Sequence, residues 1–597
     1  MHQRNKKAAI LVSFFLMICI VGFAQNPIIQ TIFTADPAPM VYQDTVYLYT
    51  GHDQDGAGYF DMRDWHIYST TDMVNWTDRG IGLSIKDFKW ANKDAWAGQC
   101  IYRNGKFYWY VPINKEGAGM SIGVAVSDHP TGPFKDAIER PLIEGGWGYI
   151  DPTVFIDNDG QAYLYWGNPT LYYVKLNKDM VSYDHKVGIV KVPLDRAGFG
   201  IRVIDANKTF SWADTVLVEQ SECFQEPKTN KFYWYTAAID HSTGQKVIGV
   251  AVADKIIGPY KDVLNKPLIT ENCDTGNINP TVIVDDHNDT LLFWGNKALF
   301  NVKLNADRMS YASKPGIQVV SKADLGKIQQ KITAASSSNG KRVSAYEEGP
   351  WFYRRKDRYY LIYPAGGVPE HLAYSTSLNP TGPWHYQDTI MSVIGKGGAF
   401  TNHPGVIDYK GKSFFFYHNG ALPGGGGFDR SVCVEPFNYN ADGTIPRISP
   451  TKQGVKHSLA PLNPYIRQEA ETIAWEQGVE TATSTIKGVY VTDLQEGAYI
   501  KVRDVNINKG AKAFKAEVWA AKSGGSIEIY VDSIGGGSLI GSLKINATGK
   551  TENWQVQSTK LRPAQGLHEG LHDLYFVFKV PDKNTFNFNW WQIKGTK

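Results

Sequence analysis

The sequence predicts an all-β fold, in which a β-propeller that contains an inserted copy of part of itself is followed by a β-sandwich. Short runs of aromatic and β-branched residues alternate with Asp-Gly, Asn-Gly and Lys-Gly turns, which is typical of antiparallel strands. No long run of helical period interrupts them between residues 28 and 450, which excludes an α/β barrel. The same short units recur along this region, and this favours a propeller over a sandwich or a solenoid.

Residues 1–24 have the pattern of a signal peptide. A basic start is followed by an apolar run from Ala8 to Ala24, with small residues at its end. The alternative, a single membrane anchor, needs about 20 apolar residues, and this run is shorter. We therefore expect a secreted or periplasmic protein with no membrane span.

The charge of the chain does not suit nucleic acid as a partner. The formal net charge is +3, and removal of residues 1–24 takes away Arg4, Lys6 and Lys7 but no acidic residue, which leaves 0. Such a chain has no electrostatic attraction for nucleic acid or an anionic membrane. The later cysteines are scattered and lack the paired spacing of a metal knuckle.

Recurring segments indicate the blades of the propeller. Strand ends of similar sequence occur at Ser69 to Trp76, Gly123 to Phe134, Gly249 to Tyr260 and Tyr374 to Trp384. The last three contain Gly-Pro followed by an aromatic residue. Segments of this kind, repeated at intervals along the chain, are expected where each blade is one antiparallel sheet.

A longer duplication lies within this region. Ile150-Asp-Pro-Thr-Val154 recurs as Ile278-Asn-Pro-Thr-Val282, and Tyr165-Trp-Gly-Asn168 recurs from Phe293. About two blades have therefore been duplicated, and residues 206–335 are the second copy. The copy has Asn279 where the first version has Asp151, so it provides no carboxyl group at that point.

The last part of the chain forms a domain of its own in this prediction. The pattern changes after Pro461, where short strands begin that continue to Trp591. Their length and spacing suit a small β-sandwich over residues 463–597. The propeller would then occupy residues 25–460.

Three acidic residues stand out as candidates for catalysis. Asp36, Asp151 and Glu348 each lie at or beside the start of a strand and are followed by Pro or by Gly-Pro. Asp-Pro and Glu-Gly-Pro are also ordinary turn sequences, so each acid taken singly could be structural. The first strand of each blade lines the centre of a propeller, however, so acids at the same relative place in different blades can converge.

Converging carboxyl groups are what glycoside hydrolysis needs. One protonated and one ionised carboxyl group must stand on either side of the scissile bond. A third carboxylate a few ångströms from the acid raises the cost of its ionisation by about 3 kcal/mol at an effective dielectric near 20, or about two pKa units. This third group would keep the general acid protonated near neutral pH.

Several motifs resemble glycoside hydrolase family 43, and in particular its arabinoxylan arabinofuranohydrolases. They are Phe33-Thr-Ala-Asp-Pro-Ala-Pro39, Leu48-Tyr-Thr-Gly-His-Asp53, Ile150-Asp-Pro-Thr-Val-Phe-Ile-Asp157, Glu347-Glu-Gly-Pro-Trp-Phe352 and Phe400-Thr-Asn-His-Pro-Gly405. The resemblance implies a five-bladed propeller and a mechanism that inverts the anomeric centre. It covers residues 27 to about 450 apart from the copied stretch.

The resemblance also implies roles for individual residues. Asp36 is expected to be the general base, Asp151 the acid that orients and tunes, and Glu348 the general acid, with Glu347 as its nearest rival. Glu347 should face the other way as the adjacent strand residue. The further matches are His403, which would touch a water-bound calcium near the channel axis, and the substrate-binding residues Trp96, Asn402 and Arg430. Core packing for Trp96, burial for His403 and an ion pair for Arg430 are the structural alternatives.

The C-terminal domain resembles carbohydrate-binding module family 6. Glu469 and Glu471 match its structural calcium ligands, and calcium prefers such hard oxygen ligands. Tyr490, Trp554 and Asn587 match or neighbour its sugar cleft, where an aromatic ring and an amide suit a sugar face and its hydroxyls. The usual aromatic residue near position 493 is Asp493 here, and Trp554 could simply pack.

The copied blades leave two arrangements open. They could widen the ring to seven blades, or they could form a lobe beside a five-bladed ring, which the intact set of acids favours. We expect a monomeric inverting exo-glycosidase that removes α-L-arabinofuranosyl side chains from arabinoxylan or a related plant polysaccharide. The alternatives are another activity of the family, as a β-xylosidase or an arabinanase, and a non-catalytic propeller that binds glycans.

Overall fold

The computed structural model describes residues 25–192, 206–255, 258–271, 276–284, 289–295, 299–319, 346–395, 397–507, 510–522, 524–535, 538–562, 569–582 and 585–595. The expected signal peptide, residues 1–24, lies outside them. Within these ranges, no helix has both the length and the apolar character needed to cross a membrane.

The chain divides into two compact units. The first consists of Met1–Leu194 together with Tyr346–Lys597, and the second is Asp195–Ala345. The second unit therefore contains the whole copied stretch, 206–335. Both units are built from strands, and the described helices are the short α1 (Ala206–Thr209) and a 3-10 turn at Ile85–Asp87.

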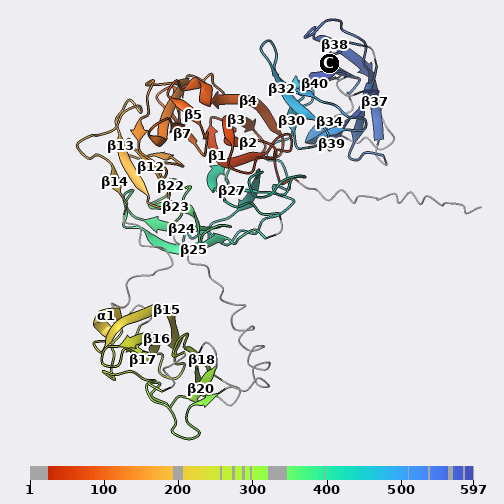
Figure 1. Cartoon of the computed structure of the whole chain (residues 1–597). Coiled ribbons are helices and arrows are strands. Elements are labelled where there is room, and N and C mark those ends of the chain that lie inside the picture. Colours follow the sequence, from red (N-terminus) through yellow and green to blue (C-terminus); the bar gives the residue numbers. More distant parts are fainter. Residues whose placement is uncertain are drawn as a thin grey trace, which may run out of the picture. The chain divides into compact units, whose positions relative to one another are not determined.

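Five antiparallel sheets make up the N-terminal part of the first unit (Figure 1). Sheet 1 contains β1 (Thr34–Tyr42), β2 (Thr45–Asp53), β3 (Met62–Thr70) and β4 (Trp76–Ser84). Sheet 2 contains β5 (Ala91–Lys93), β6 (Gln99–Arg103), β7 (Lys106–Lys115), β8 (Gly119–Ser127), β9 (Lys135–Asp136) and β10 (Ile143–Glu144). Sheet 3 contains β11 (Thr153–Ile156), β12 (Ala162–Trp166), β13 (Tyr172–Leu176) and β14 (Val190–Lys191).

The chain returns from the second unit to form the other two of these sheets. Sheet 4 contains β22 (Trp351–Arg355), β23 (Arg358–Ala365), β24 (His371–Ser377) and β25 (His385–Met391), and sheet 5 contains β26 (Gly405–Tyr409), β27 (Lys412–Asn419) and β28 (Ser431–Phe437). Four of the five junctions between sheets are made by β1, β6, β11, β22 and β26: β1 contacts β6 and β26, and β11 contacts β6 and β22. Sheets 4 and 5 are joined by an ion pair of 3.5 Å between Arg355 and Asp408.

Turn residues define these hairpins in the way the sequence predicts. Arg103 of β6 pairs with Lys106 of β7 across a two-residue turn. The two turn residues, Asn104 and Gly105, both have positive φ, 49° and 82°. A two-residue hairpin of this kind requires φ above zero at both positions, which Asn and Gly adopt most readily.

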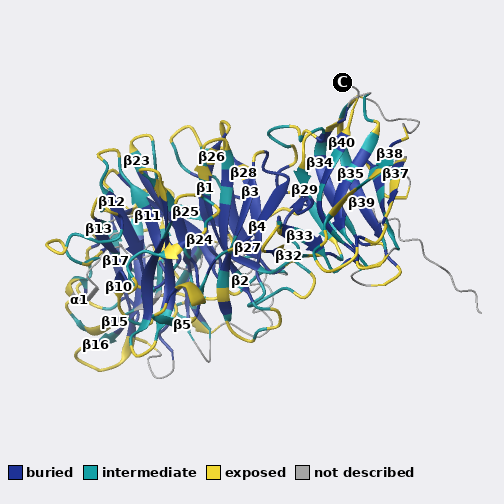
Figure 2. Ribbon diagram, turned by 90° about the horizontal axis from the view of Figure 1, so that it is seen from above, coloured by how far each residue is buried: buried dark blue, intermediate teal, exposed yellow. Residues whose placement is uncertain are grey.

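The core of these sheets is aromatic. Trp65 of sheet 1 and Trp109 of sheet 2 are fully buried, with ring centroids 6.2 Å apart, and Tyr49 packs edge-on against Trp109. Figure 2 shows that the strands are largely buried and that the connecting loops carry most of the exposed residues. Sheets packed face to face through large side chains leave their strand ends and loops free to form a site.

The C-terminal domain is a sandwich of two antiparallel sheets. One has the order β32 (Glu480–Ser484), β33 (Gly488–Thr492), β40 (Asn587–Lys594), β35 (Ala513–Trp519) and β38 (Gln555–Lys560), with β29 (Gln468–Glu469) also beside β40. The other has the order β31 (Trp475–Gln477), β34 (Tyr499–Ile507), β39 (Gly570–Lys579), β36 (Ser526–Val531) and β37 (Ser538–Lys544). Aliphatic and aromatic residues of both sheets form one core, as alternation predicts.

A short strand joins this domain to the N-terminal sheets. β30 (Thr472–Ile473) pairs with β4 and extends sheet 1. Next to it, the Asn75 side chain donates to the Arg503 carbonyl at 3.0 Å and accepts from the Arg503 N–H at 2.8 Å. The Asn75 side chain therefore satisfies both backbone groups of one buried residue of β34.

The second unit holds two sheets of its own. They are β15 (Ala213–Gln225), β16 (Phe232–Asp240) and β17 (Lys246–Ala253), and β18 (Thr281–Val284), β19 (Thr290–Trp294), β20 (Phe300–Lys303) and β21 (Gln318–Val319). Asn279 has φ 52°, close to the 57° of Asp151 at the equivalent place in the first unit. The copy thus keeps the backbone conformation but not the carboxyl group.

Candidate active site

Asp36, Asp151 and Glu348 come together around one histidine. Asp36 lies in β1, Asp151 lies just before β11, and Glu348 lies just before β22. His403 Nδ1 is 3.5 Å from Asp36 Oδ1, and His403 Nε2 is 3.8 Å from Glu348 Oε1. Since both nitrogens belong to one ring, the two carboxyl oxygens are less than about 10 Å apart, which is compatible with the roughly 6.5–9.5 Å of an inverting pair.

Two of the acids and the residue after the third have left-handed backbone conformations. The φ angles are 54° at Asp36, 57° at Asp151 and 52° at Gly349. The Gly349 N–H donates to Asp151 Oδ2 at 3.1 Å, and a Cβ at Gly349 would lie 2.9–3.0 Å from the His403 ring. This explains the Glu-Gly-Pro motif, because a residue with a side chain at 349 would be strained and would press on His403.

Arg430 fixes the position of the Asp36 carboxylate. Its Nη1 donates to Asp36 Oδ1 at 2.9 Å, while its Nη2 and Nε donate to the two oxygens of Asp53 at 2.7 and 2.9 Å. All three side chains are at most 3% exposed. A bidentate pair of this kind gives the guanidinium a single orientation. Arg430 is therefore not in a surface ion pair, and Asp53 is a site residue that sequence reasoning missed.

Charges around Asp36 favour its ionised form. Burial alone would raise the pKa of Asp36, but Arg430, His403 and His418 together outweigh burial and lower the pKa below its usual value of 3.8. His418 also holds the backbone, because its Nδ1 accepts the Asp36 N–H at 3.1 Å and its Nε2 donates to the Thr401 carbonyl at 2.8 Å. Burial and the neighbouring Arg430 lower the pKa of His418 to about 3, so this ring is neutral.

The pKa of His403 is raised, in contrast to that of His418. Burial opposes its protonation, but the carboxylates of Asp36, Asp151 and Glu348 raise the pKa of His403 to about 10. It is therefore an imidazolium between the acids at neutral pH. Its role as a contact of a water-bound calcium stays a prediction. Asp151, Glu348 and His403 do offer three ligand atoms within 4.8 Å of one another.

Asp151 retains a proton to an unusually high pH. Burial, together with the carboxylates of Glu348 and Asp36, raises the pKa of Asp151 to about 8, although His403 and the Gly349 N–H act in the other direction. Sequence reasoning assigned Asp151 to raise the pKa of its partner, and that role stays a prediction.

Glu348 has a neutral hydrogen-bond partner. Asn168 Nδ2 donates to Glu348 Oε2 at 2.6 Å, and the Glu348 side chain is 13% exposed. Asn168 ends the Trp-Gly-Asn motif that the duplication repeats, which is the signal that could have identified it.

The expectation that Glu347 faces away is wrong, because Glu347 lines the same cavity as Glu348. Both glutamates precede β22, so strand alternation does not apply to them.

A cavity of about 240 Å³ opens above these groups. Asp36, Asp151, Glu348 and Arg430 line it, with Trp96 and Trp147 on one wall. Trp96 is 7% exposed and donates from Nε1 to the Phe60 carbonyl at 3.0 Å, whereas Trp147 is 63% exposed and packs edge-on against Trp96. The volume lies below the roughly 300–1,000 Å³ of sites for drug-sized ligands, so the cavity suits a single sugar unit.

Glu370 is a further buried carboxyl group in this cavity. Burial, with the nearby Glu348, raises the pKa of Glu370 well above its usual value. Its Oε2 accepts the Asn402 N–H at 2.9 Å, and Asn402 Oδ1 accepts the His418 N–H at 3.2 Å. The structure thus places Asn402 in a supporting layer below the acids, and its role in holding substrate hydroxyls stays a prediction.

Aromatic residues gather on the β33–β40–β35 face of the C-terminal domain. The Trp554 ring lies 5.2 Å from Tyr490 and 5.9 Å from Trp519, measured between ring centroids. Asn587 lies on β40, where its Oδ1 accepts the Thr492 hydroxyl at 2.6 Å. Tyr490, Trp554 and Asn587 are all partly exposed. Trp519 was missed by sequence reasoning and belongs to this aromatic group.

The predicted calcium ligands of this domain have different environments. Glu471 is 5% exposed, and its Oε2 has no hydrogen-bond partner among the described residues. Burial, with Glu469 and Asp78 nearby, raises the pKa of Glu471 well above its usual value. An unpartnered buried carboxylate oxygen fits a hard cation. Glu469 instead accepts three hydrogen bonds from Arg467, at 3.0, 3.3 and 2.8 Å.

Comparison with known families agrees with this architecture. A model of the glycosyl hydrolases family 43 matches residues 24–211 and 202–445, which is more than half of the chain. The chain belongs to this family. The model of carbohydrate-binding module family 6 matches residues 469–595. The chain is thus a glycoside hydrolase of family 43 with a family 6 module at its C-terminal end.

Individual relatives cover most of the chain. It is 30% identical to an arabinoxylan arabinofuranohydrolase of Bacillus subtilis over 95% of this chain and 92% of that protein. It is 29% identical to an arabinoxylan arabinofuranohydrolase of Paenibacillus polymyxa over 76% and 74%. A crystal structure of a family 43 arabinoxylan arabinofuranohydrolase from Bacillus subtilis in complex with cellotetraose has a TM-score of 0.59 at 23% identity, covering 96% and 98%. This likeness shows that the chain has the propeller and sandwich fold of the family.

Proposed function

We propose that this family 43 enzyme hydrolyses α-L-arabinofuranosyl side chains from arabinoxylan, with inversion at the anomeric carbon. The observation that carries the proposal is the convergence of Asp36, Asp151 and Glu348 on His403 at the base of a cavity sized for one sugar. The names of the two Bacillus and Paenibacillus relatives support the choice of substrate.

The electrostatics assign different roles to the acids. Asp36 is the general base, because the charges around it lower its pKa and keep it ready to accept a proton from water. Glu348 is the general acid, because it is the more exposed carboxyl group and faces the cavity. Water attacks the anomeric carbon, Asp36 takes the water proton, and Glu348 gives its proton to the leaving oxygen as the glycosidic bond breaks.

Asp151 orients and tunes the general acid in this proposal. Its raised pKa means that Asp151 keeps its own proton up to about pH 8. The Gly349 N–H fixes the Asp151 carboxyl group. Trp96 and Arg430 bound the cavity and contact the sugar in this proposal, with Asn402 holding the supporting layer in place.

The catalytic set belongs to a five-bladed ring in this proposal. Sheets 1 to 4, and sheets 5 and 1, touch through β1, β6, β11, β22 and β26, and an ion pair joins sheets 4 and 5. The copied stretch forms a compact unit of its own. The family 6 module holds the enzyme on its polysaccharide through Tyr490, Trp554 and Asn587. We further propose that residues 1–24 direct export of a monomeric enzyme to the periplasm or the medium.

Substitution of the acid tests this function directly. Glu348→Gln keeps the shape of the side chain but removes the transferable proton, so release of arabinose from wheat arabinoxylan should fall by about 10²–10⁴-fold. Binding to insoluble arabinoxylan should persist. Glu347→Gln is the matched control, because it changes the adjacent carboxyl group of the same cavity and should lose less than about tenfold.

The same assay separates the alternatives. Linear arabinan and aryl β-xyloside are supplied in parallel, and product from either of these in place of arabinoxylan identifies an arabinanase or a β-xylosidase. Binding of arabinoxylan by the wild type without any product identifies a non-catalytic glycan-binding propeller. Full activity of Glu348→Gln would remove Glu348 from its role.

Calcium has a separate test in the module. We propose that Glu471, with its unpartnered oxygen, and Glu469 bind a structural calcium ion, and that a second ion near His403 is held through water. Ligands that bind only the folded state raise its melting temperature. Calcium added to chelator-treated protein should therefore raise the Tm of the wild type by more than that of Glu471→Gln, which keeps only the ion near His403.

A further inference from the structure

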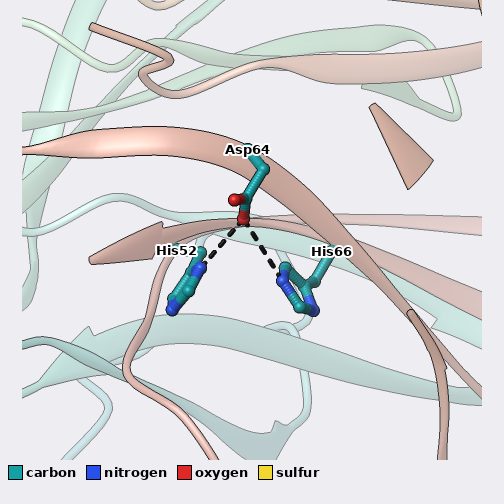
Figure 3. Close-up of side chains that lie close together, drawn as sticks. All are labelled: His52, Asp64 and His66. Atoms are coloured by element: carbon teal, nitrogen blue, oxygen red, sulfur yellow. Dashed lines mark hydrogen bonds and ion pairs between the residues drawn. The ribbon is translucent and has the colours of Figure 1, made fainter. Parts of the chain in front are cut away.

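A second group of metal-binding side chains lies on sheet 1, outside the catalytic set. His52 of β2 and Asp64 and His66 of β3 place their ligand atoms within 4.8 Å of one another (Figure 3). His52 Nδ1 is 2.8 Å and His66 Nε2 is 3.2 Å from the same oxygen, Asp64 Oδ1. The mechanism proposed above uses none of the three.

Strand register explains why these side chains meet. Gly51 pairs with Trp65 and Asp53 with Met62, and the register is irregular between these two pairs, where His52 and Asp64 lie. His66 follows Asp64 by two positions and therefore points to the same face of the sheet. Opposite and diagonal residues on one face are within reach of long side chains. The three side chains therefore meet where the pairing of β3 with its neighbours is irregular.

We propose that His52, Asp64 and His66 bind one zinc-type divalent transition-metal ion. Two imidazole nitrogens and one carboxylate are a donor set that zinc and its neighbours accept, in contrast to the all-oxygen sets of calcium and magnesium. Metal–ligand bonds of 2.0–2.2 Å in a tetrahedral site put ligand atoms about 3.3 Å apart. The two nitrogen–oxygen distances are already close to that separation.

The hydrogen bonding of His66 supports an ion. Among the described residues, neither ring nitrogen of His66 has a hydrogen-bond partner of good geometry, although both atoms are buried. Buried polar atoms without partners are costly. A bound ion would accept the lone pair of His66 Nε2 and so give one of the two ring nitrogens a partner. The three side chains are 12–20% exposed, which leaves a path for an ion to enter.

The position of the group indicates what a bound ion would do. His52 immediately precedes Asp53, which holds Arg430, and Arg430 in turn holds the Asp36 carboxylate. Met62, two residues before Asp64, lines the sugar cavity. An ion that joins β2 to β3 at this point would stiffen the strand ends that carry these residues. It is a structural ion, because the three ligands do not line the cavity.

Zinc binding to the full-length, tag-free protein tests the proposal. After removal of metals with a chelator, ZnCl2 is titrated calorimetrically, bound zinc is counted by elemental analysis, and Co²⁺ is added to look for the absorption bands of a tetrahedral site. We expect about one equivalent of zinc, a rise in Tm on binding, and at least about tenfold weaker binding in His66→Gln and Asp64→Asn.

A matched control separates this site from ordinary histidine pairs. His241 and Asp214 form a single exposed pair at 2.5 Å without a second histidine, so His241→Gln should leave zinc binding unchanged. If Asp64→Asn does not fold, His52→Gln takes its place. Less than about 0.2 equivalents of zinc on the wild type, or equal binding by all variants, would show that Asp64 simply pairs with two histidines and that no ion binds there.

Discussion

At the scale of single residues, the site depends on backbone conformations that ordinary residues avoid. Asp36 and Asp151 have positive φ, and the hydrogen bonds from the Asp36 N–H to His418 and from the Gly349 N–H to Asp151 hold them in place. Such conformations persist where the surroundings determine them, and they cluster at functional sites. The hydrogen bonds that position the two catalytic carboxyl groups therefore also hold the strained backbone at these residues.

Gly349→Ala should damage both stability and catalysis. The new Cβ would need a φ of 52° and would lie within 3.0 Å of the His403 ring, so the ring must move. We expect a loss of about 1–3 kcal/mol in the free energy of unfolding and a fall of at least tenfold in kcat. Gly105→Ala is the control, because φ there is 82° but no atom lies within 4 Å of the added Cβ. It should lose stability and keep its activity.

The pH dependence of the reaction should reflect the raised pKa of Asp151. The pKa of Asp36 lies below 3.8 and that of Asp151 is about 8, so kcat/KM should be flat between about pH 4 and 8. Above about pH 8 Asp151 loses its proton and the rate falls. Asp151→Asn has no carboxyl group to titrate at this position, so its alkaline limb should lie at a different pH. An alkaline limb at the same pH in both proteins would contradict this assignment.

At the scale of strands and sheets, sequence patterns predicted a great deal. The three acids were identified from sequence because each precedes or begins the first strand of a sheet. Their partners Asp53, His418 and Glu370 could not be identified from sequence. These residues matter because they contact segments that are distant in the chain. Glu347 was misjudged because strand alternation was applied to residues that precede the strand. Periodicity predicts faces only within an element.

The junction between sheet 1 and the sandwich offers a test at this scale. Asn75→Ala would remove both hydrogen bonds that its side chain makes to the buried backbone of Arg503. We expect the enzyme to lose about 2 kcal/mol of stability. Urea unfolding followed by tryptophan fluorescence measures this. Asn158→Ala on an exposed turn should change stability by less than about 0.5 kcal/mol.

For the whole molecule, the division into two units separates catalysis from the duplication. Each residue assigned to the reaction lies in the first unit, in Met1–Leu194 or Tyr346–Lys597. The copied sheets have their own cores, with Tyr235 and Trp294 fully buried in one of them. A unit with its own core can be removed without exposing the interior of another.

Replacement of residues 195–345 by a flexible Gly/Ser linker should therefore leave a folded enzyme. We expect kcat/KM on a small aryl arabinofuranoside to stay within about threefold of the wild type, because no catalytic group is lost. Circular dichroism and the Tm of the shortened protein check its fold. A soluble, folded product without activity would mean that the copied sheets complete the site.

Asn279 in the duplicate differs from Asp151 in the catalytic unit by a single side-chain heavy atom. Its φ of 52° retains the unusual bend that Asp151 requires, and asparagine, like aspartate, tolerates that bend better than most residues do. The duplicate has thus kept the backbone conformation of this position but lost its carboxyl group. What separates a scaffold from a catalyst at this position is the exchange of a single oxygen for an amide nitrogen.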